Sequence, residues 1–359
     1  MKFRGNKCPF IAINSLSEPF TMSEMCTTCV LAQTACCKLK CGFAFWYNFM
    51  FMKFQTKSII YFLSGLAIGA VIVTAVASRK IDPAATPVEM SSEGRPQYKW
   101  YAPHVPSSID FCGEAVPVER WEVHEKLDRE LLVNTYLHGS QLYILKLAGR
   151  YFPIIEERLK ANNMPTDLKY VCVAESALQQ NAWSSVGAAS FWQFMKDTGP
   201  RYGLEINDEV DERFNVVKAT DAACQYFKEA HNKFGSWTAA AASYNCGMAG
   251  FAKQAEFQQT SNYYDLIFPE ETNRYVFRIV ALKHLLSNAH KNGMMIESSD
   301  EYKPLKYRTV TVTETISNLT EFAMANGTSY KMLKIYNPWL RDRKLTVKAG
   351  KSYEIQLPQ

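Results

Sequence analysis

A long helical pattern runs through the middle of this 359-residue chain, from about Val118 to Leu285. Apolar residues recur there at spacings of three and four, as at Leu127 and Leu131, and this spacing places them on one face of a helix. No strand-like alternation of any length interrupts the pattern. The sequence therefore predicts a mainly α fold, with a helical domain over residues 119–295.

The tail of the chain has a different pattern. Residues 307–312 are rich in β-branched side chains and residues 353–358 alternate with period two, so both segments are predicted strands. Between them, apolar residues at helical spacing predict two helices, at about 319–323 and 332–336. The order strand, helix, helix, strand predicts a small α+β module over residues 305–358.

The amino-terminal third contains an apolar run from Ser58 to Ala77, with basic residues before and after it. A basic start, an apolar centre and a small-residue end are typical of an export signal. The run is also long enough to cross a bilayer, which takes about 20 apolar residues. Residues 52–80 are therefore expected to be a signal peptide or a membrane anchor. Residues 81–118 contain six prolines and are expected to form a linker or an irregular arm.

Six of the ten cysteines lie in the first 41 residues, and they include the pair Cys26 and Cys29. Thiolates at such short spacing can chelate zinc, but no histidine accompanies them. Residues 1–51 are therefore interpreted as an extension outside the fold or as an artefact of the start site. No metal and no other cofactor is predicted for the chain.

The composition restricts the class of partner. Apolar residues make up 47% of the chain and charged residues 21%, so most of it can fold around a core. The formal charge of +5 is mild for this length, and no basic tract of the kind that coats nucleic acid follows the amino-terminal region. We therefore predict no nucleic-acid partner.

One carboxylate falls on the apolar face of a predicted helix. The helix is expected to follow the break at Pro165, with Thr166 as its N-cap. Leu168, Val171 and Glu175 then lie on one face. An unpaired charge on a buried face is costly. Glu175 is therefore either a salt-bridged residue near a helix end or a catalytic acid whose pKa is raised by desolvation.

Four short motifs follow one another along the helical stretch. They are Glu175-Ser176, a Gly-Ala segment that runs from Gly187 to Met195, Tyr244-Asn245-Cys246-Gly247, and Glu271-Thr272-Asn273-Arg274-Tyr275-Val276. In this order and at these intervals, residues 120–290 resemble the lytic murein transglycosylase family, above all its membrane-bound D-type branch. The resemblance implies a lysozyme-like helical fold in the cell envelope, on the periplasmic side, with peptidoglycan glycan strands as substrate.

The resemblance also implies chemistry at a single carboxyl group. Glu175 would protonate the glycosidic oxygen between N-acetylmuramic acid and N-acetylglucosamine, and would then deprotonate the muramoyl 6-hydroxyl, which closes a 1,6-anhydro ring. Because the substrate supplies the nucleophile, one carboxyl can act as acid and then as base, and no second carboxylate is required. The residues expected to bind substrate or support Glu175 are Ser176, Gly187, Phe191, Gln193, Met195, Tyr244, Asn245 and Tyr275.

These residue types fit separate tasks. Gln193, Tyr244 and Asn245 offer directed donors and acceptors to sugar groups, and Phe191 and Met195 are expected to form an apolar wall for sugar rings. In the same resemblance, Tyr275 would reach Glu175 from the last helix. The usual second glycine of the Gly-Ala segment is Ser190 here, a departure that concerns the geometry of the loop.

The tail resembles a single LysM module, which implies binding of glycans that contain N-acetylglucosamine. Asn337 and the turn at 347–351 match the module, whereas Thr313-Glu314-Thr315 replaces its usual Gly-Asp-Thr. The alternative for the tail is a structural cap without a ligand. Two alternatives also stay open for the whole chain: a hydrolytic muramidase on the same scaffold, and a non-catalytic peptidoglycan-binding protein.

Overall fold

The computed structural model describes residues 101–359 of the chain. The extension expected over residues 1–51 and the signal or anchor expected over 52–80 lie outside the described residues, as does the first part of the expected arm. Between residues 101 and 359, none of the helices combines the length and the hydropathy needed to cross a membrane.

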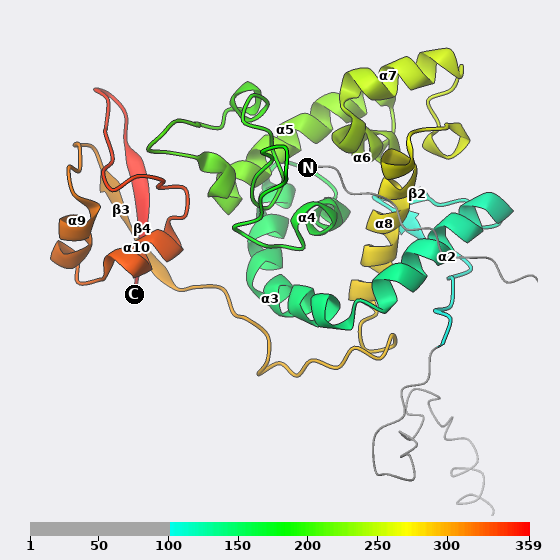
Figure 1. The fold of residues 1–359 in the computed structure, drawn as a ribbon, viewed down its shortest axis with the longest axis horizontal. Coiled ribbons are helices and arrows are strands. Elements are labelled where there is room, and N and C mark those ends of the chain that lie inside the picture. The colour runs from blue at the N-terminus through cyan, green and yellow to red at the C-terminus, as the bar shows by residue number, and fades with distance from the viewer. Residues whose placement is uncertain (1–100) are drawn as a thin grey trace, which may run out of the picture. The chain divides into compact units, whose positions relative to one another are not determined.

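The first domain is helical, as predicted, and Figure 1 shows its helices packed around α4. Its elements in chain order are β1 (Asp110–Phe111), β2 (Glu114–Ala115), α2 (Trp121–Thr135), α3 (His138–Ala161), η1 (Thr166–Leu168), α4 (Lys169–Ser176), η2 (Gly199–Tyr202), η3 (Glu212–Phe214), α5 (Val216–Phe234), α6 (Trp237–Cys246), α7 (Met248–Phe257), η4 (Tyr263–Asp265) and α8 (Glu270–Ser287).

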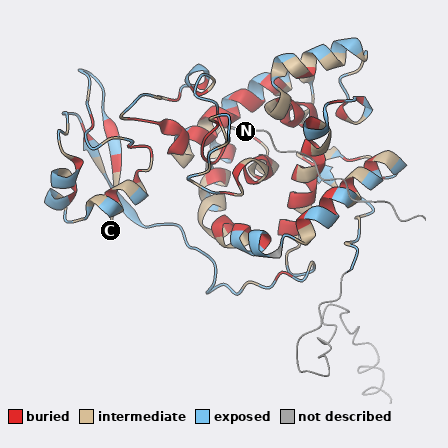
Figure 2. Cartoon of the chain, viewed as in Figure 1, coloured by how far each residue is buried: buried red, intermediate tan, exposed pale blue. Residues whose placement is uncertain are grey.

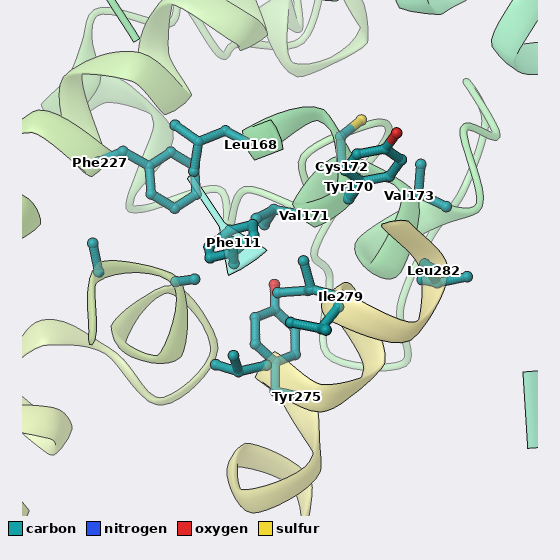
Figure 3. Close-up of a cluster of buried hydrophobic side chains, with 14 of the residues drawn as sticks. Phe111, Leu168, Tyr170, Val171, Cys172, Val173, Phe227, Tyr275, Ile279 and Leu282 are labelled. Carbon is teal, nitrogen blue, oxygen red and sulfur yellow. The ribbon is translucent and has the colours of Figure 1, made fainter. Parts of the chain in front are cut away.

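The core of this domain forms where α8 contacts α2, α4 and α6. Figure 2 shows the buried residues of α5 and α8 on the sides of these helices that face the other helices. In Figure 3, Tyr275 and Ile279 of α8 lie in one apolar cluster with Val171 and Cys172 of α4. The short helix α4 is therefore held on the core by apolar contacts along most of its length.

The first described segment is tied to the helical domain by a carboxylate. Strands β1 and β2 pair antiparallel, and Phe111 is buried in the core. Glu114 accepts hydrogen bonds from the backbone N–H groups of Trp237 (2.6 Å) and Thr238 (2.9 Å), at the start of α6. A carboxylate at a helix N-terminus satisfies unpaired donors and complements the helix dipole. Part of the expected linker or arm is thus anchored to the fold.

The entry to α4 differs from the prediction. Thr166 is the first residue of the 3₁₀ turn η1, and the residue before α4 is Leu168, which makes no side-chain capping hydrogen bond. The α-helix starts at Lys169 and ends at Ser176, where Ala177 takes a left-handed conformation with φ of 52°. The expected N-cap at Thr166 is therefore wrong, because a tight turn after Pro165 begins the helix instead.

The tail forms the predicted strand, helix, helix, strand module. Its elements are β3 (Tyr307–Val312), α9 (Leu319–Ala325), α10 (Tyr330–Tyr336) and β4 (Tyr353–Pro358). Strands β3 and β4 are antiparallel, with Tyr307 opposite Pro358 and Val312 opposite Tyr353. Asn337 after α10 is buried; its Oδ1 accepts from the N–H of Gln356 (2.8 Å), which ties the second helix to β4.

Candidate active site

Glu175 lies in the last turn of α4, half-buried, where it meets the last helix of the domain. The hydroxyl of Tyr275, on α8, donates a hydrogen bond to Oε1 of Glu175. The left-handed residue Ala177 ends α4 two residues later. A helix C-terminus carries partial negative charge, so the helix dipole does not stabilise an ionised carboxylate at this position.

The surroundings of Glu175 favour its protonated form. Desolvation by burial raises the pKa of Glu175 to about 7, and the negative charge of Glu271 acts in the same direction. The hydrogen bond from Tyr275 and the positive charge of Arg278 oppose this shift. At neutral pH, both forms of the carboxyl group are therefore populated, as a group that first gives and then takes a proton requires.

Two tyrosines near Glu175 stay protonated. Burial raises the pKa of Tyr244 and of Tyr275 well above the ordinary value, and the charge of Glu175 adds to both shifts. Tyr275 is therefore a fixed donor to the carboxyl group. Tyr244 donates to the backbone oxygen of Trp192 (2.7 Å), and its ring stacks on Phe227 with 5.0 Å between centroids.

A cleft of about 340 Å³ opens beside Tyr244. Four of the residues predicted to bind substrate line it, namely Gln193, Met195, Tyr244 and Asn245. The other lining residues are Phe194, Thr198, Tyr226, Cys246 and Gly247. The wall contains amide, hydroxyl and apolar groups, the mixture that sites for polar small molecules commonly have.

Residues 152–267 match the model of the transglycosylase SLT domain, and residues 308–359 match that of the soluble lytic transglycosylase C-terminal LysM-like domain. The chain contains an SLT domain followed by a LysM-like domain. These two matches agree with the helical domain, its cleft and the strand, helix, helix, strand module described above.

Relatives with curated names match over part of their length. Membrane-bound lytic murein transglycosylase D of Escherichia coli K12 is 28% identical over 243 residues, which cover 66% of this chain and 52% of the relative. A putative tributyltin chloride resistance protein of an Alteromonas species is 28% identical over 122 residues, or 32% of this chain and 59% of that protein. The chain thus spans about half the length of the curated transglycosylase it matches.

Among solved structures, a lytic transglycosylase is similar to part of this chain. It is an inactive mutant of the lytic transglycosylase Slt from Pseudomonas aeruginosa, 18% identical, with a TM-score of 0.31 over 42% of this chain and 26% of that chain.

Left-handed residues shape the SLT-domain loop that carries Gln193. Ser190 has φ of 62° and Gln193 has φ of 49°, values that residues other than glycine seldom adopt. Ser190, which replaces a usual glycine, is held by two hydrogen bonds: its N–H donates to Ala182 O (2.7 Å) and its Oγ to Gln180 O (2.8 Å). Nε2 of Gln193 donates to Ser190 O at 2.8 Å.

The amide of Asn245 is oriented by α8. Its Oδ1 accepts a hydrogen bond from Oγ1 of Thr272 at 2.7 Å. Thr272 lies one turn before Tyr275 on the same helix. The helix that contacts Glu175 therefore also sets the direction of a cleft-lining amide.

Three predicted residues lie elsewhere. The Phe191 side chain is 1% exposed and packs edge-on against Tyr151, so it belongs to the core and does not form the expected wall of the cleft. Ser176 is buried, and its Oγ donates back to Cys172 O (3.1 Å) within α4. Gly187 occupies a turn with φ of 90°, which requires a residue without Cβ or one under strain.

The sequence prediction missed contributors to the site. Tyr226 and Thr198 line the cleft, and Arg278 acts on the carboxyl group of Glu175. Arg278 could have been found from sequence, because it lies three residues after Tyr275 on the same predicted helix and so faces the same side. Within residues 101–359, no cluster of three or more His, Cys, Asp or Glu side chains could hold a metal ion.

Proposed function

We propose that this chain is a peptidoglycan lytic transglycosylase that cleaves the β-1,4 bond between N-acetylmuramic acid and N-acetylglucosamine. The observation that carries the proposal is the state of Glu175: a carboxyl group with a pKa of about 7, held by Tyr275 and next to the tyrosine that lines a cleft of sugar size. The SLT-domain match and the named relative support the same activity.

In the proposed first step, protonated Glu175 gives its proton to the glycosidic oxygen. The bond between this oxygen and C1 of the muramoyl residue breaks, and N-acetylglucosamine leaves with the proton. A desolvated carboxyl group with a raised pKa suits this step, because it keeps a proton at neutral pH. The donor Tyr275 then stabilises the carboxylate that remains, since a hydrogen bond to a charged acceptor strengthens as the charge forms.

In the second step, the Glu175 carboxylate removes the proton of the muramoyl 6-hydroxyl. The 6-oxygen bonds to C1, which closes the 1,6-anhydro ring and returns Glu175 to its protonated form. The proton and electron balance closes without water or a cofactor. Glu175 is not itself among the residues that line the cleft, and those residues include no other carboxylate, as expected where the substrate supplies the nucleophile.

The cleft residues are proposed to bind the glycan strand. Gln193 and Asn245 offer amide groups to N-acetyl and hydroxyl groups of the sugars, and Met195, 40% exposed, offers an apolar surface to a sugar ring. We further propose that the chain works in the cell envelope, with residues 52–80 as its signal or anchor. Glycan binding by the LysM-like domain is likewise a proposal.

The test is digestion of purified sacculi by the wild-type chain and by Glu175→Gln. The amide keeps the size of the side chain and its acceptor for Tyr275, but cannot exchange the proton. We expect the variant to fold, to bind glycan and to release no soluble muropeptides. A Glu175→Gln variant as active as the wild type would end the proposal.

A further inference from the structure

Residues 205–213, which we call the docking segment, lie between the LysM-like domain and the cleft of the SLT domain. They contact residues 187–195, which we call the cleft loop and which carry Gln193 and Met195. We propose that Arg213 positions the cleft loop for glycan binding and that the LysM-like domain holds Arg213 in place. The inference rests on the proposed function, in which this cleft binds the glycan strand.

The docking segment pairs with the LysM-like domain through its backbone. The N–H of Asp211 donates to Trp339 O at 2.8 Å, and the N–H of Arg341 donates to Glu209 O at 2.7 Å. Val210, between these two bonds, is buried in the core of the LysM-like domain. The two domains are therefore joined in this region by backbone hydrogen bonds and by a common hydrophobic cluster.

Carboxylates of the docking segment fix the same contact. Both oxygens of Glu209 accept from Thr346, from its N–H at 2.6 Å and from its hydroxyl at 3.0 Å, and Lys344 lies 3.1 Å from Glu209. The hydroxyl of Tyr353 donates to Glu205 at 3.0 Å. Donation from the N–H of Thr346 lowers the pKa of Glu209, so its charged form is favoured at neutral pH.

Arg213 continues the contact into the SLT domain. Its side chain is 3% exposed, and it forms a two-pronged pair with Asp211, with Nε–Oδ1 at 2.9 Å and Nη2–Oδ2 at 2.7 Å. The remaining Nη1 donates to the backbone oxygens of Gly187 and Phe194, each at 3.0 Å. The planar fork of arginine can make these bonds at once, which a lysine ammonium cannot do with the same geometry.

The two oxygens bound by Arg213 lie near opposite ends of the cleft loop. Phe194 stands between Gln193 and Met195, so holding its carbonyl group sets the directions of both neighbouring side chains. The loop also contains left-handed Ser190 and Gln193, a conformation that costs free energy unless outside contacts hold it. Arg213 supplies such contacts without itself lining the cleft, so its role is positioning.

The first test compares Arg213→Lys with Arg158→Lys in the full chain, using soluble peptidoglycan glycan chains as substrate. Arg158 is the matched control, because it forms a similar two-pronged pair with Asp221 (2.9 Å for both bonds), with no bond to the cleft loop. We expect Arg213→Lys to raise KM about tenfold with kcat within about twofold, and Arg158→Lys to change neither. A purely structural role for Arg213 would lower the melting temperature and the active fraction while KM stayed unchanged.

The second test asks whether the LysM-like domain acts through Arg213. Glu209→Ala removes bonds to Thr346 without touching the cleft, and we expect it to raise KM about threefold. In the double variant with Arg213→Lys, KM should equal that of Arg213→Lys alone, because both changes release the same loop. An unchanged KM in Glu209→Ala, or effects that multiply in the double variant, would overturn the role of the LysM-like domain.

Dissociation constants for glycan binding test the role of Arg213 independently of whether the chain cleaves glycan. In the Glu175→Gln background, binding of the same glycan chains can be measured without cleavage. We expect Arg213→Lys to raise the dissociation constant by the same factor as KM. If the wild type cleaves no glycan but binding still weakens, only the proposed function fails. If binding is unaffected, the positioning role of Arg213 is overturned whether or not the wild type is active.

Discussion

The Tyr275 hydroxyl, on α8, donates a hydrogen bond to the carboxyl group of Glu175, at the end of α4. This bond joins residues 100 positions apart in the sequence. It lowers the pKa of a group that burial raises, and the pKa settles at about 7. Burial and this hydrogen bond are the two largest contributions to the proton affinity on which the proposed reaction depends.

Removal of that donor should shift the pH dependence of the reaction. Because the hydrogen bond from Tyr275 lowers the pKa of Glu175, Tyr275→Phe should raise this pKa. The acid form would persist to higher pH, so the alkaline limb of kcat/KM should move upward from about 7. A pH profile of both proteins on soluble glycan chains checks this. An unmoved limb, or one shifted to lower pH, would mean that another group controls it.

The raised pKa of Glu175 should also make the free energy of unfolding depend on pH. The pKa of Glu175 is about 7 in the folded chain and 4.5 as the unperturbed value, so the folded state binds the extra proton between these pH values. Stability is then lost as pH rises through this window, by about 3 kcal/mol. Glu175→Gln has no such loss.

Thermal melting of both proteins across pH measures the effect. The advantage of Glu175→Gln in melting temperature should be smallest near pH 4 and largest above about pH 7. Glu256→Gln is the control, because it makes the same substitution at a residue that lies exposed on α7. A difference in melting temperature between wild type and Glu175→Gln that stays constant with pH would contradict a carboxyl group whose pKa is raised by desolvation.

Truncation of two apolar residues in the cleft loop should change different quantities, KM at Met195 and stability at Phe191. Met195→Ala removes an exposed side chain, so it should raise KM severalfold while the free energy of unfolding changes by less than about 1 kcal/mol. Phe191→Ala empties a core position and should cost about 3–5 kcal/mol. Urea denaturation and steady-state kinetics on both variants give the two quantities. Equal loss of stability in both would contradict the placement of Met195 in the cleft.

The bond from Thr272 to Asn245 offers another check on the cleft. Thr272→Val keeps the shape of the side chain and removes the donor that orients the Asn245 amide. We expect KM to rise about threefold with no shift of the pH profile, because Glu175 keeps its hydrogen bond. A shifted profile would show instead that the change disturbs α8 around Tyr275.

The elements with strong periodic patterns were predictable from the sequence. The helical run from about Val118 to Leu285 and both strands of the tail follow from the spacing of apolar or β-branched residues. Glu175 was found in the same way, as a charge on an apolar face. The sequence left two alternatives for Glu175, and the desolvation that raises its pKa to about 7 favours the catalytic acid.

Features that depend on contacts between distant segments were not predictable. Glu114 caps α6 from more than 120 positions away, so nothing near the prolines of residues 101–118 indicates that this segment joins the fold. Phe191 and Met195 are both large and apolar, and only packing against Tyr151 separates a core residue from a cleft residue. The pairing of Arg213 with two loop carbonyls left no pattern in the sequence.

The most direct test of the central claim is to measure whether oxygen from ¹⁸O-enriched water (heavy oxygen) enters the products. Intact sacculi would be digested in such water by the wild type, and the released muropeptides analysed by mass spectrometry. If Glu175 removes the proton of the muramoyl 6-hydroxyl and the 6-oxygen bonds to C1, every new muramoyl end is an anhydro ring without heavy oxygen. New ends that carry one heavy oxygen would show that water is the nucleophile, and would contradict the account.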